Sequence, residues 1–585
     1  MAKRRAGVGI DRRGLLMAGA GLATGALPWP DARAQVTPPG TGAGARDPDW
    51  TLLEGRIAGR LLTPDWPLGR CLAGGDCAAF FASARNPYFL GDDPSLTQTL
   101  GWVDAWVSQP SARVLEAASG ADIAAAIRFA REHGVRVAVK GGGHSYTGGS
   151  NAVDSLLIWT RRLNAIELHD AFTPAGGGEP VEAVSVGAGA MWGEVYRRVC
   201  AGAGRYVQGG GCLTVGVAGL IQSGGFGSFS KGFGTAAASL LEAEVVTADG
   251  TIRTVNASRD PELFFALKGG GGGTFGVVTR VTLRTHAMPA TIGAVFADVS
   301  ARSDAAYRAL IDRMLRHYAE ELHNPHWGEQ IGFRPDNSLR LSMLCQGLGQ
   351  ERMEETWAPF WAWLRERPED YVLSDPVIVV LEGRRFWDPD VLKTQPGIVL
   401  VDDQPGADQD RIYWAGNREE SGQFLHAFAS AWVPEAALEP REALVTGLLE
   451  ASRRWSITLH VNKGLAGAPG EIRERVRAGT ATNPAAVDSF ALAIAGAEGP
   501  PAYPGVRSFE PDTTLARRQA GQVRAAMDTL KAHVPAKGSY LSESDYFETD
   551  WQAAFWGGHH DRLRAAKAAY DPGDLFRVHH GIIAG

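Results

Sequence analysis

Three glycine-rich stretches in the first half of this chain constrain its fold most. They cover residues 141–149, 209–234 and 269–276, and strand-like apolar residues flank each of them. A flexible linker would lack such flanks, so we interpret the stretches as loops of a folded domain. Glycine lets backbone N–H groups approach an anion closely, which is one way proteins hold phosphate without cations. The loops therefore predict a large cofactor that carries phosphate.

The third loop formally contains a dinucleotide-binding fingerprint, Gly271-x-Gly273-x-x-Gly276. In a Rossmann domain this loop opens a helix. Here the following residues, 277–283 (VVTRVTL), alternate in polarity as a strand does. We therefore reject the Rossmann fold and expect a different α+β domain.

Hydrophobic periodicity supports the α+β class. Residues 119–134 read as an amphipathic helix that stops at Gly134, and 135–140 (VRVAVK) read as a short buried strand. Residues 187–204 read as a strand end, a turn and a helix. Residues 241–256 read as a hairpin that turns at Asp249-Gly250.

A chain of 585 residues is too long for one compact core. The composition of the sequence changes near residue 290, where glycine loops give way to Trp- and Arg-rich helical stretches. We expect a first domain over 35–290, a second over 291–535 and a segment 536–585 that returns to the first.

One strand of the second domain indicates the nature of its sheet. In 455–464 (WSITLHVNKG) apolar residues alternate with polar ones, which include His460. A sheet with an apolar face on a core and a polar face would suit the wall of a substrate cleft. A sheet whose polar face is simply wet is an equally good interpretation of this strand.

The amino terminus, residues 1–34, reads as an export signal. It has a basic start, an apolar stretch over Leu15–Leu27 and a small-residue cleavage site at Ala32-Arg33-Ala34. The pair Arg12-Arg13 resembles a twin-arginine signal, so we expect a periplasmic or extracellular protein. An uncleaved basic tail is the alternative. No other segment reads as transmembrane.

Cysteine usage fits that compartment in part. Cys71 and Cys77 are close enough in sequence to form a disulfide, whereas Cys200 and Cys345 lie in apolar surroundings typical of buried thiols. Cys212 fits neither description. The net charge of −7 argues against a nucleic-acid partner.

His144 lies inside the first glycine loop, where it could be a metal ligand, a general base or a satisfied polar group. Neither His144 nor Cys212 has a second ligand at zinc-finger or HExxH spacing, so we expect no metal site. The adjacent pairs His559-His560 and His579-His580 point to different faces of any regular element, which argues against metal binding there too.

At these residues the chain resembles a known family, the berberine-bridge-enzyme-like branch of the vanillyl-alcohol-oxidase (PCMH-type FAD-binding) superfamily. The matching segments are 142–149 (GGHSYTGG), 212–216 (CLTVG), 267–279 (LKGGGGGTFGVVT) and 551–576. The resemblance implies a two-lobed FAD-binding domain, with its core over about 105–288, and a substrate domain whose antiparallel sheet is covered by helices. The tail is closest to an isoamyl-alcohol-oxidase-like subgroup.

The resemblance also implies a cofactor and its site. In the family the histidine is bonded to the 8α-carbon of FAD and the cysteine to flavin C6, so FAD attached to both His144 and Cys212 is expected. The other residues that the resemblance places against FAD are Lys140, Gly141, Gly142, Gly143, Ser145, Tyr146, Gly148, Val215, Gly216, Gly219, Gln222, Gly224, Gly225, Gly227, Gly276 and Val278.

The chain departs from the family at two places. Leu220 stands where many relatives carry histidine, so Gln222 is the candidate for its hydrogen bond to the flavin. The tail reads Tyr540-Leu541-Ser542 instead of Tyr-x-Asn. Tyr540, Asp545 and His460 are the candidate catalytic residues.

Tyr540 could act as a base only if nearby positive charge or hydrogen bonds lowered the pKa of its phenol from about 10. A core tyrosine bonded to a backbone group is the alternative interpretation.

The resemblance implies an oxidase that moves hydride from a carbinol carbon to FAD and electrons to O2, releasing hydrogen peroxide. Val215 belongs among the catalytic residues because valine at this position accompanies oxidases in the family. The alternatives are a dehydrogenase with another electron acceptor, an amine oxidase, and a flavin-bearing binding protein without turnover. Peroxide release over a substrate panel would separate them. We expect as partners a small-molecule substrate, O2 and the export machinery.

Overall fold

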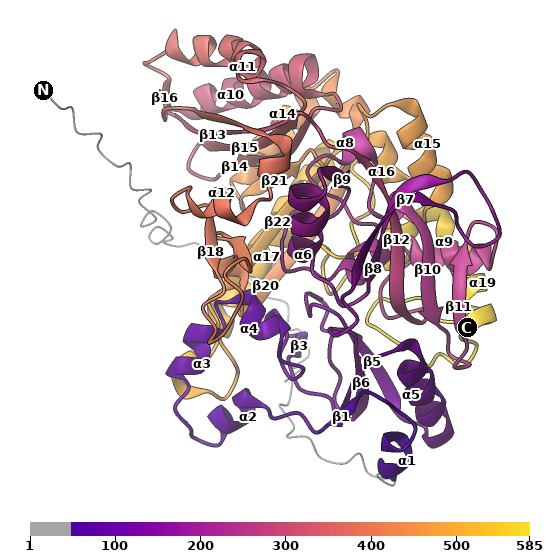
Figure 1. The fold of residues 1–585 in the computed structure, drawn as a ribbon. Coiled ribbons are helices and arrows are strands. Elements are labelled where there is room, and N and C mark those ends of the chain that lie inside the picture. The colour runs from indigo at the N-terminus through magenta and orange to yellow at the C-terminus, as the bar shows by residue number, and fades with distance from the viewer. Residues whose placement is uncertain (1–47) are drawn as a thin grey trace, which may run out of the picture. The chain divides into compact units, whose positions relative to one another are not determined.

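Residues 48–585 are described by the computed structural model, and two sheets hold their glycine-rich half (Figure 1). The smaller sheet pairs its last three strands in parallel. Helix α5 (Gly120–His133) packs on it through an apolar face that includes Ile123 and Ile127. Ser119 caps the helix, and Gly134, at φ 65°, ends it, as predicted. The strands are β1 (Arg60–Leu62), β4 (Arg113–Glu116), β6 (Ser155–Trp159) and β5 (Arg136–Lys140).

The second sheet is antiparallel and includes the predicted hairpin. Strands β10 and β11 pair across the turn at Asp249-Gly250, and β12 runs between β10 and β8. The third glycine loop thus leads into a strand, which confirms that this is not a Rossmann domain. The strands in spatial order are β11 (Ile252–Asn256), β10 (Leu240–Val246), β12 (Val277–Ala287), β8 (Val181–Gly187) and β7 (Ile166–Phe172), with β9 (Arg205–Val207) on β12.

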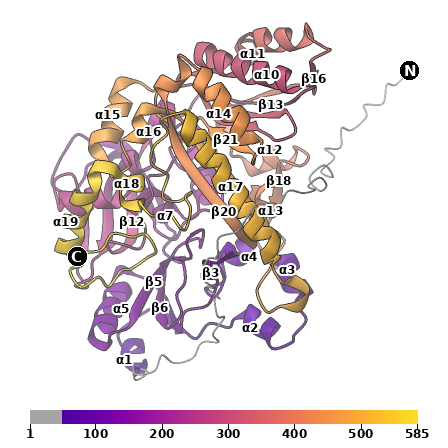
Figure 2. The same cartoon turned by 180° about the vertical axis from the view of Figure 1, so that it is seen from behind.

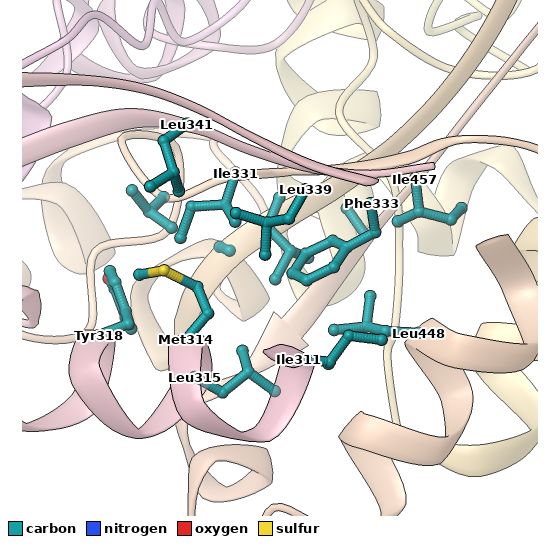
Figure 3. Close-up of a cluster of buried hydrophobic side chains, with 14 of the residues drawn as sticks. Ile311, Met314, Leu315, Tyr318, Ile331, Phe333, Leu339, Leu341, Leu448 and Ile457 are labelled. Atoms are coloured by element: carbon teal, nitrogen blue, oxygen red, sulfur yellow. The ribbon is translucent and has the colours of Figure 1, made fainter. Parts of the chain in front are cut away.

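The third sheet is the largest, and helices cover one of its faces. In Figure 2 the long helix α17 (Thr513–His533) runs beside β20 (Gln423–Pro434). Figure 3 shows how α10 and α14 place Ile311, Met314 and Leu448 against Ile331 and Phe333 of the sheet. The other covering helices are α10 (Asp304–His317), α11 (Gln350–Arg365) and α14 (Glu442–Ser452).

The strand whose alternating polarity left its role open lies inside this sheet. Strands β14, β21, β22 and β20 are consecutive neighbours. The predicted strand 455–464 is shorter than expected, because only Ile457–His460 is extended and a turn follows. The remaining strands are β16 (Tyr371–Leu373), β13 (Thr291–Ala301), β15 (Ser338–Gln346), β14 (Trp327–Phe333), β22 (Ser489–Gly499), β3 (Trp106–Val107) and β17 (Val377–Glu382).

One part of the first half joins this large sheet. Strand β2 (Thr99–Trp102) pairs in parallel with β20, so residues 99–107 depart from the boundary drawn at residue 290. Pairing between strands about 320 positions apart leaves no local signal in the sequence.

The carboxy-terminal segment packs on the glycine-rich half. Lys567 is fully buried, forms an ion pair with Asp571 and donates to the carbonyl oxygen of Thr274 at 2.7 Å, next to the third glycine loop. A bridge between Val137 and Phe576 ties the same segment to the small sheet. The helices here are α18 (Trp551–Trp556) and α19 (His560–Tyr570).

The four cysteines for which the sequence made a definite prediction lie as predicted. Cys71 and Cys77 form a disulfide, and Cys200 and Cys345 are buried free thiols.

The predicted export signal lies outside the described residues. Among residues 48–585, no helix combines the length and the apolar character needed to cross a bilayer. The remaining elements are α1 (Thr51–Glu54), α2 (Pro67–Leu72), α3 (Ala78–Ser83), α4 (Pro87–Gly91), α6 (Trp192–Tyr196), α7 (Val217–Gln222), α8 (Ser230–Phe233), α9 (Pro261–Leu267), α12 (Pro389–Lys393), α13 (Asn417–Glu420), α15 (Gly470–Gly479), α16 (Ala485–Asp488), β18 (Val399–Val401) and β19 (Ile412–Trp414).

Candidate active site

The first two glycine loops pack directly on each other. A Cβ atom on Gly142 would lie 2.8 Å from the backbone nitrogen of Gly216 and 2.9 Å from the carbonyl oxygen of Thr214. The same close approach holds in reverse, because a Cβ on Gly216 would lie 2.8 Å from the nitrogen of Gly142. Any side chain at either position would push the loops apart. Glycine here brings the two loops together.

That contact brings His144 and Cys212 to one hydroxyl group. Thr214 Oγ1 lies 3.2 Å from His144 Nε2 and 3.5 Å from Cys212 Sγ. Thr214 is 0 % exposed, so the hydroxyl is held in place by its surroundings. His144 and Cys212 themselves keep partial access to solvent. Both residues can therefore face one bound group.

Burial sets the charge of both groups. It lowers the pKa of His144 to about 4, so the imidazole is neutral at pH 7 and has a free lone pair. Burial also raises the pKa of the Cys212 thiol, against the lowering effect of the hydrogen bond with Thr214. His144 is thus ready as a nucleophile, whereas Cys212 must lose a proton before it can react.

A short hydrogen-bond chain links Cys212 to a carboxylate that the sequence gave no reason to single out. The thiol donates to Asn417 Oδ1 at 3.5 Å, and Asn417 Nδ2 donates to Glu420 Oε2 at 2.9 Å. Both partners belong to the short helix α13, directly before β20. These hydrogen bonds therefore connect the second glycine loop to the residues that lead into β20 of the large sheet.

The second and third glycine loops meet at Gln222. Its carbonyl oxygen accepts from Gly271 N at 2.8 Å, and its side-chain nitrogen donates to Ala218. The side-chain oxygen Oε1 is buried and lacks a partner among the described residues. An orphaned acceptor between two glycine loops fits a bound group that donates a hydrogen bond, as the N–H of a flavin ring does.

Not every predicted cofactor residue is free to touch a ligand. Lys140 is buried and donates to the carbonyl oxygens of Asp93 and Leu96, so it anchors the first loop. Ser145 Oγ accepts from Gly149 N within the same loop, and Val278 packs in the core of the second sheet. A Cβ on Gly227 or Gly276 would strike a neighbouring carbonyl oxygen. Positive φ angles occur at Gly143, Gly148, Gly224, Gly225 and Gly276.

By contrast, a Cβ on Gly219 would meet nothing within 4 Å, and one on Gly141 would make only ordinary contacts. These two backbones can face a ligand. Val215 is partly buried against the core of the second sheet, and its carbonyl oxygen accepts from Trp192 N. Its predicted part in oxygen reactivity stays a prediction.

The face of the large sheet away from its covering helices, which we call the free face, packs in part on the second glycine loop, since Leu492 and Ile494 share a buried cluster with Phe226 and Tyr540. Along β22 the alanines from Ala491 to Ala497 face the helix-covered core, whereas Leu492 and Ile494 face the other way. Glu498 shares the parity of Leu492 and Ile494, so it lies on the free face. His460 lies opposite Leu492 on β21, and burial, followed by the charge of Lys463, lowers its pKa well below the ordinary value.

Tyr540 does not meet the condition set for a base. It is 6 % exposed and packs edge-on against Phe226, with ring centroids 5.3 Å apart. Burial raises the pKa of its phenol, and the charge of Glu543 raises it further. Hydrogen bonds with the Ser542 side chain and the Gly225 backbone oppose the shift without reversing it. The alternative interpretation, a core tyrosine bonded to backbone, describes this residue better.

Asp545 is held by Arg524 of α17. Its two oxygens lie 2.7 Å and 3.3 Å from the guanidinium, and one also accepts from Phe547 N. Both oxygens of this carboxylate are thus engaged, an arrangement that favours a structural role.

Further carboxylates lie on the large sheet and in the carboxy-terminal segment. Glu329, at the unusual φ of 78° on β14, accepts a hydrogen bond from Ser228. Glu543 forms an ion pair with Lys463, whose ammonium lies 5.8 Å from the Tyr540 ring centroid. Burial raises the pKa of Glu329, Glu420 and Glu498 alike.

Two family models match the chain where the sequence resemblance was found. The FAD binding domain matches residues 111–256, and the berberine and berberine-like domain matches 539–583. The FAD-linked oxidoreductase penH of Penicillium thymicola is 30 % identical over 472 residues, which cover 79 % of this chain and 74 % of penH. The chain belongs to the berberine-bridge-enzyme-like FAD-linked oxidoreductases. It is therefore an FAD-dependent enzyme of the α+β class, as the resemblance implied.

Solved structures show the same fold. A VAO-type flavoprotein from Myceliophthora thermophila C1 has a TM-score of 0.74 at 23 % identity, covering 93 % of this chain and 96 % of that one. The glucooligosaccharide oxidase of Acremonium strictum, described with a 6-S-cysteinyl, 8α-N1-histidyl FAD, has a TM-score of 0.62 at 19 % identity over 88 % and 99 %. The likeness places this FAD-linked oxidoreductase among the VAO-type folds.

Sequence reasoning missed most of the polar groups in the cleft. Thr214 lies inside the quoted CLTVG segment, and its spacing from Cys212 could have marked it. The sheet-side groups Glu329, Glu420 and Glu498 carried no motif, because three separate parts of the chain supply them.

Proposed function

We propose that this FAD-linked oxidoreductase holds FAD through covalent bonds to His144 and Cys212 and oxidises an alcohol. The overall reaction converts a CH–OH group to C=O and reduces O2 to hydrogen peroxide. The observation that carries the proposal is the single hydroxyl of Thr214 between the two attachment residues. Attachment through the imidazole Nδ1 is favoured, because Nε2 is the atom that faces Thr214.

When bound, FAD supplies the two-electron acceptor, and the protein supplies position and proton transfer. The glycine loops and the orphaned oxygen of Gln222 would hold the isoalloxazine and the pyrophosphate. The free face of the large sheet would orient the alcohol.

Glu498 is the candidate proton acceptor on that face. No described residue gives it a hydrogen bond or an ion pair within contact distance, whereas Glu329, Glu420 and Glu543 each have one. Burial raises its pKa towards the operating pH, which suits a general base. Glu498 therefore replaces Tyr540 and Asp545 as the residue that takes the hydroxyl proton in our proposal.

The test has two parts. Flavin should stay with the chain after acid precipitation, and peptide mass spectrometry should find it on both His144 and Cys212. Primary and secondary alcohols should then bleach the flavin anaerobically and yield peroxide in air. Flavin on neither residue would overturn the covalent proposal. Bleaching without reoxidation in air would replace the oxidase by a dehydrogenase.

We also propose export by the twin-arginine route, which suits an enzyme that folds around a covalent cofactor before transport. The support is the sequence of residues 1–34 alone. Changing Arg12-Arg13 to Lys-Lys should keep the enzyme in the cytoplasm. Unchanged export would contradict the proposal.

A further inference from the structure

Steric contact, which holds the first two glycine loops together, does not hold the backbone just before Cys212. A Cβ on Gly142 or Gly216 would strike backbone atoms, whereas a Cβ on Gly211 would meet nothing within 4 Å. Gly211 is also exposed. The cysteine that follows it therefore needs other contacts to fix its position.

A segment from a distant part of the chain supplies these contacts. Residues 399–417, which we call the β18–β19 segment, contain the hairpin β18–β19 and the first residue of α13. Trp414 Nε1 donates to the carbonyl oxygen of Gly211 at 2.7 Å. The thiol of Cys212 donates to Asn417 Oδ1 at 3.5 Å. Two successive residues of the second glycine loop are thus bonded to one segment.

The β18–β19 segment is itself held by α4 and by the residue that follows α4. Arg411 forms an ion pair with Asp92, and its guanidinium lies 4.2 Å from the ring centroid of Tyr88. The hydroxyl of Tyr88 donates to the carbonyl oxygen of Ile412 at 3.1 Å. Because these contacts do not involve the glycine loop, the segment can act as a fixed support for Cys212.

The side-chain amide of Asn417 has one orientation, which its second partner sets. Its Nδ2 donates to Glu420 Oε2 at 2.9 Å, and an ionised carboxylate can only accept. The oxygen Oδ1 is therefore the atom that faces the thiol. The thiol proton then points to Asn417, so Thr214 is the donor in its 3.5 Å contact with the sulfur. Thr214 Oγ1 can then accept from His144 Nε2, which agrees with attachment through Nδ1.

We propose, on the basis of the proposed function, that Asn417 is a positioning residue that orients the Cys212 thiol for its bond to flavin C6, and that Trp414 fixes the adjacent backbone. The new S–C bond replaces the S–H bond of the thiol and one C–H bond of the ring. The two protons and two electrons that are lost convert O2 to hydrogen peroxide. The bond at Cys212 thus depends on a residue 205 positions further along the chain, whereas the bond at His144 does not.

The experiment compares Asn417→Ala with the wild-type enzyme, both purified with their cofactor. Peptide mass spectrometry gives the share of chains with flavin on Cys212 and the share with flavin on His144. We expect the Cys212 share to fall at least fivefold and the His144 share to fall less than twofold. Unchanged shares would overturn the proposal. So would a proportional loss at both residues, because a merely structural role lowers both alike.

Two further variants locate the effect. Trp414→Phe keeps an aromatic ring but removes the N–H donor to Gly211, so the Cys212 share should fall severalfold. An unchanged share would remove Trp414 from the proposal. Asn164→Ala is the matched control, because Asn164 is exposed and its side chain bonds to no other described residue. It should leave both shares unchanged. Thermal unfolding shows that each variant is folded.

Alkylation of the thiol separates this proposal from the proposed function. A hydrogen bond from the neutral thiol disfavours the thiolate, which is the reactive form. Iodoacetamide should therefore label free Cys212 at least threefold faster in Asn417→Ala than in the wild type. If wild-type Cys212 carries no flavin and this difference is found, the covalent bond is wrong and the positioning of the thiol stands; without the difference both are wrong. If Cys212 carries flavin equally in both enzymes, attachment stands and the positioning role is wrong.

Discussion

The glycine loops and the carboxylates of the sheet side, Glu329, Glu420, Glu498 and Glu543, are built in different ways. The loops are placed by backbone contact, since Gly142 and Gly216 approach so closely that a Cβ on either would meet backbone nitrogen at 2.8 Å. The carboxylates are placed by the fold of the large sheet, since strands β14 and β22, helix α13 and the loop before α18 supply their side chains. Close backbone contact thus holds the glycine loops, the proposed cofactor side, in place. Charged side chains characterise the sheet, the proposed substrate side.

The comparison predicts that small changes damage the two sides differently. On the cofactor side an added atom should disturb structure. On the substrate side a removed charge should disturb function while the fold stays intact. The predictions that follow test this contrast from the largest expected effect to the smallest.

Gly142→Ala should have the largest effect. The new Cβ must displace the backbone of Gly216 or Thr214, an overpacking that costs about 1–3 kcal/mol. We expect lower thermal stability and loss of most bound flavin. Gly521→Ala is the matched control, because its Cβ would meet nothing within 4 Å on the helix α17. A Gly142→Ala enzyme with normal flavin content would show that the two loops do not need their contact.

Glu498→Gln should slow anaerobic flavin reduction at least a hundredfold and leave flavin content unchanged, because it removes the proton acceptor and adds no bulk. Tyr540→Phe should slow it far less, since the buried phenol is protonated at neutral pH. Stopped-flow absorbance measures both. Equal losses in the two variants would return Tyr540 to the catalytic role.

The pH dependence of the wild-type enzyme also tests whether Glu498 is the proton acceptor. Burial raises the pKa of Glu498, and only the ionised form accepts a proton, so the reduction rate should rise with pH through a value above that of an ordinary glutamate. The Gln variant should lose this rise. A rate that falls as the pH rises would contradict a carboxylate base.

Thr214→Val should reduce the share of chains that carry flavin on both residues severalfold. Valine matches the shape of threonine but removes the hydroxyl between His144 and Cys212. Thr214→Ser restores the hydroxyl and should restore most of the attachment, whereas a purely structural role would not require it. Peptide mass spectrometry gives the shares directly.

The two sides also differ in how far the sequence reveals them. The rejected Rossmann fold and the helix that ends at Gly134 could be predicted, because local residues determine each of them. The attachment roles of His144 and Cys212 stay predictions. Glu420 and Glu498 could not be predicted, because their proximity depends on β20 and β22 lying side by side. The early strand β2 was misplaced for the same reason. Burial, which raises the pKa of the Tyr540 phenol, also cannot be read from a motif, and the catalytic role of Tyr540 stays a prediction.

The smallest expected effect concerns oxygen, at Val215 on the cofactor side. If Val215 lines the space beside the flavin where O2 reacts, leucine there adds one methylene to a close-packed region and displaces what occupied it. Val215→Leu should then slow reoxidation in air severalfold and leave anaerobic reduction by substrate nearly unchanged. Stopped-flow measurement of the two half-reactions decides the matter. Equal changes in both would make Val215 a packing residue, which its contact with the core of the second sheet also allows. Val215 lies next to Thr214 and two residues before Val217 at the start of α7, so slower reoxidation alone would extend the steric character of the cofactor side to its reaction with oxygen.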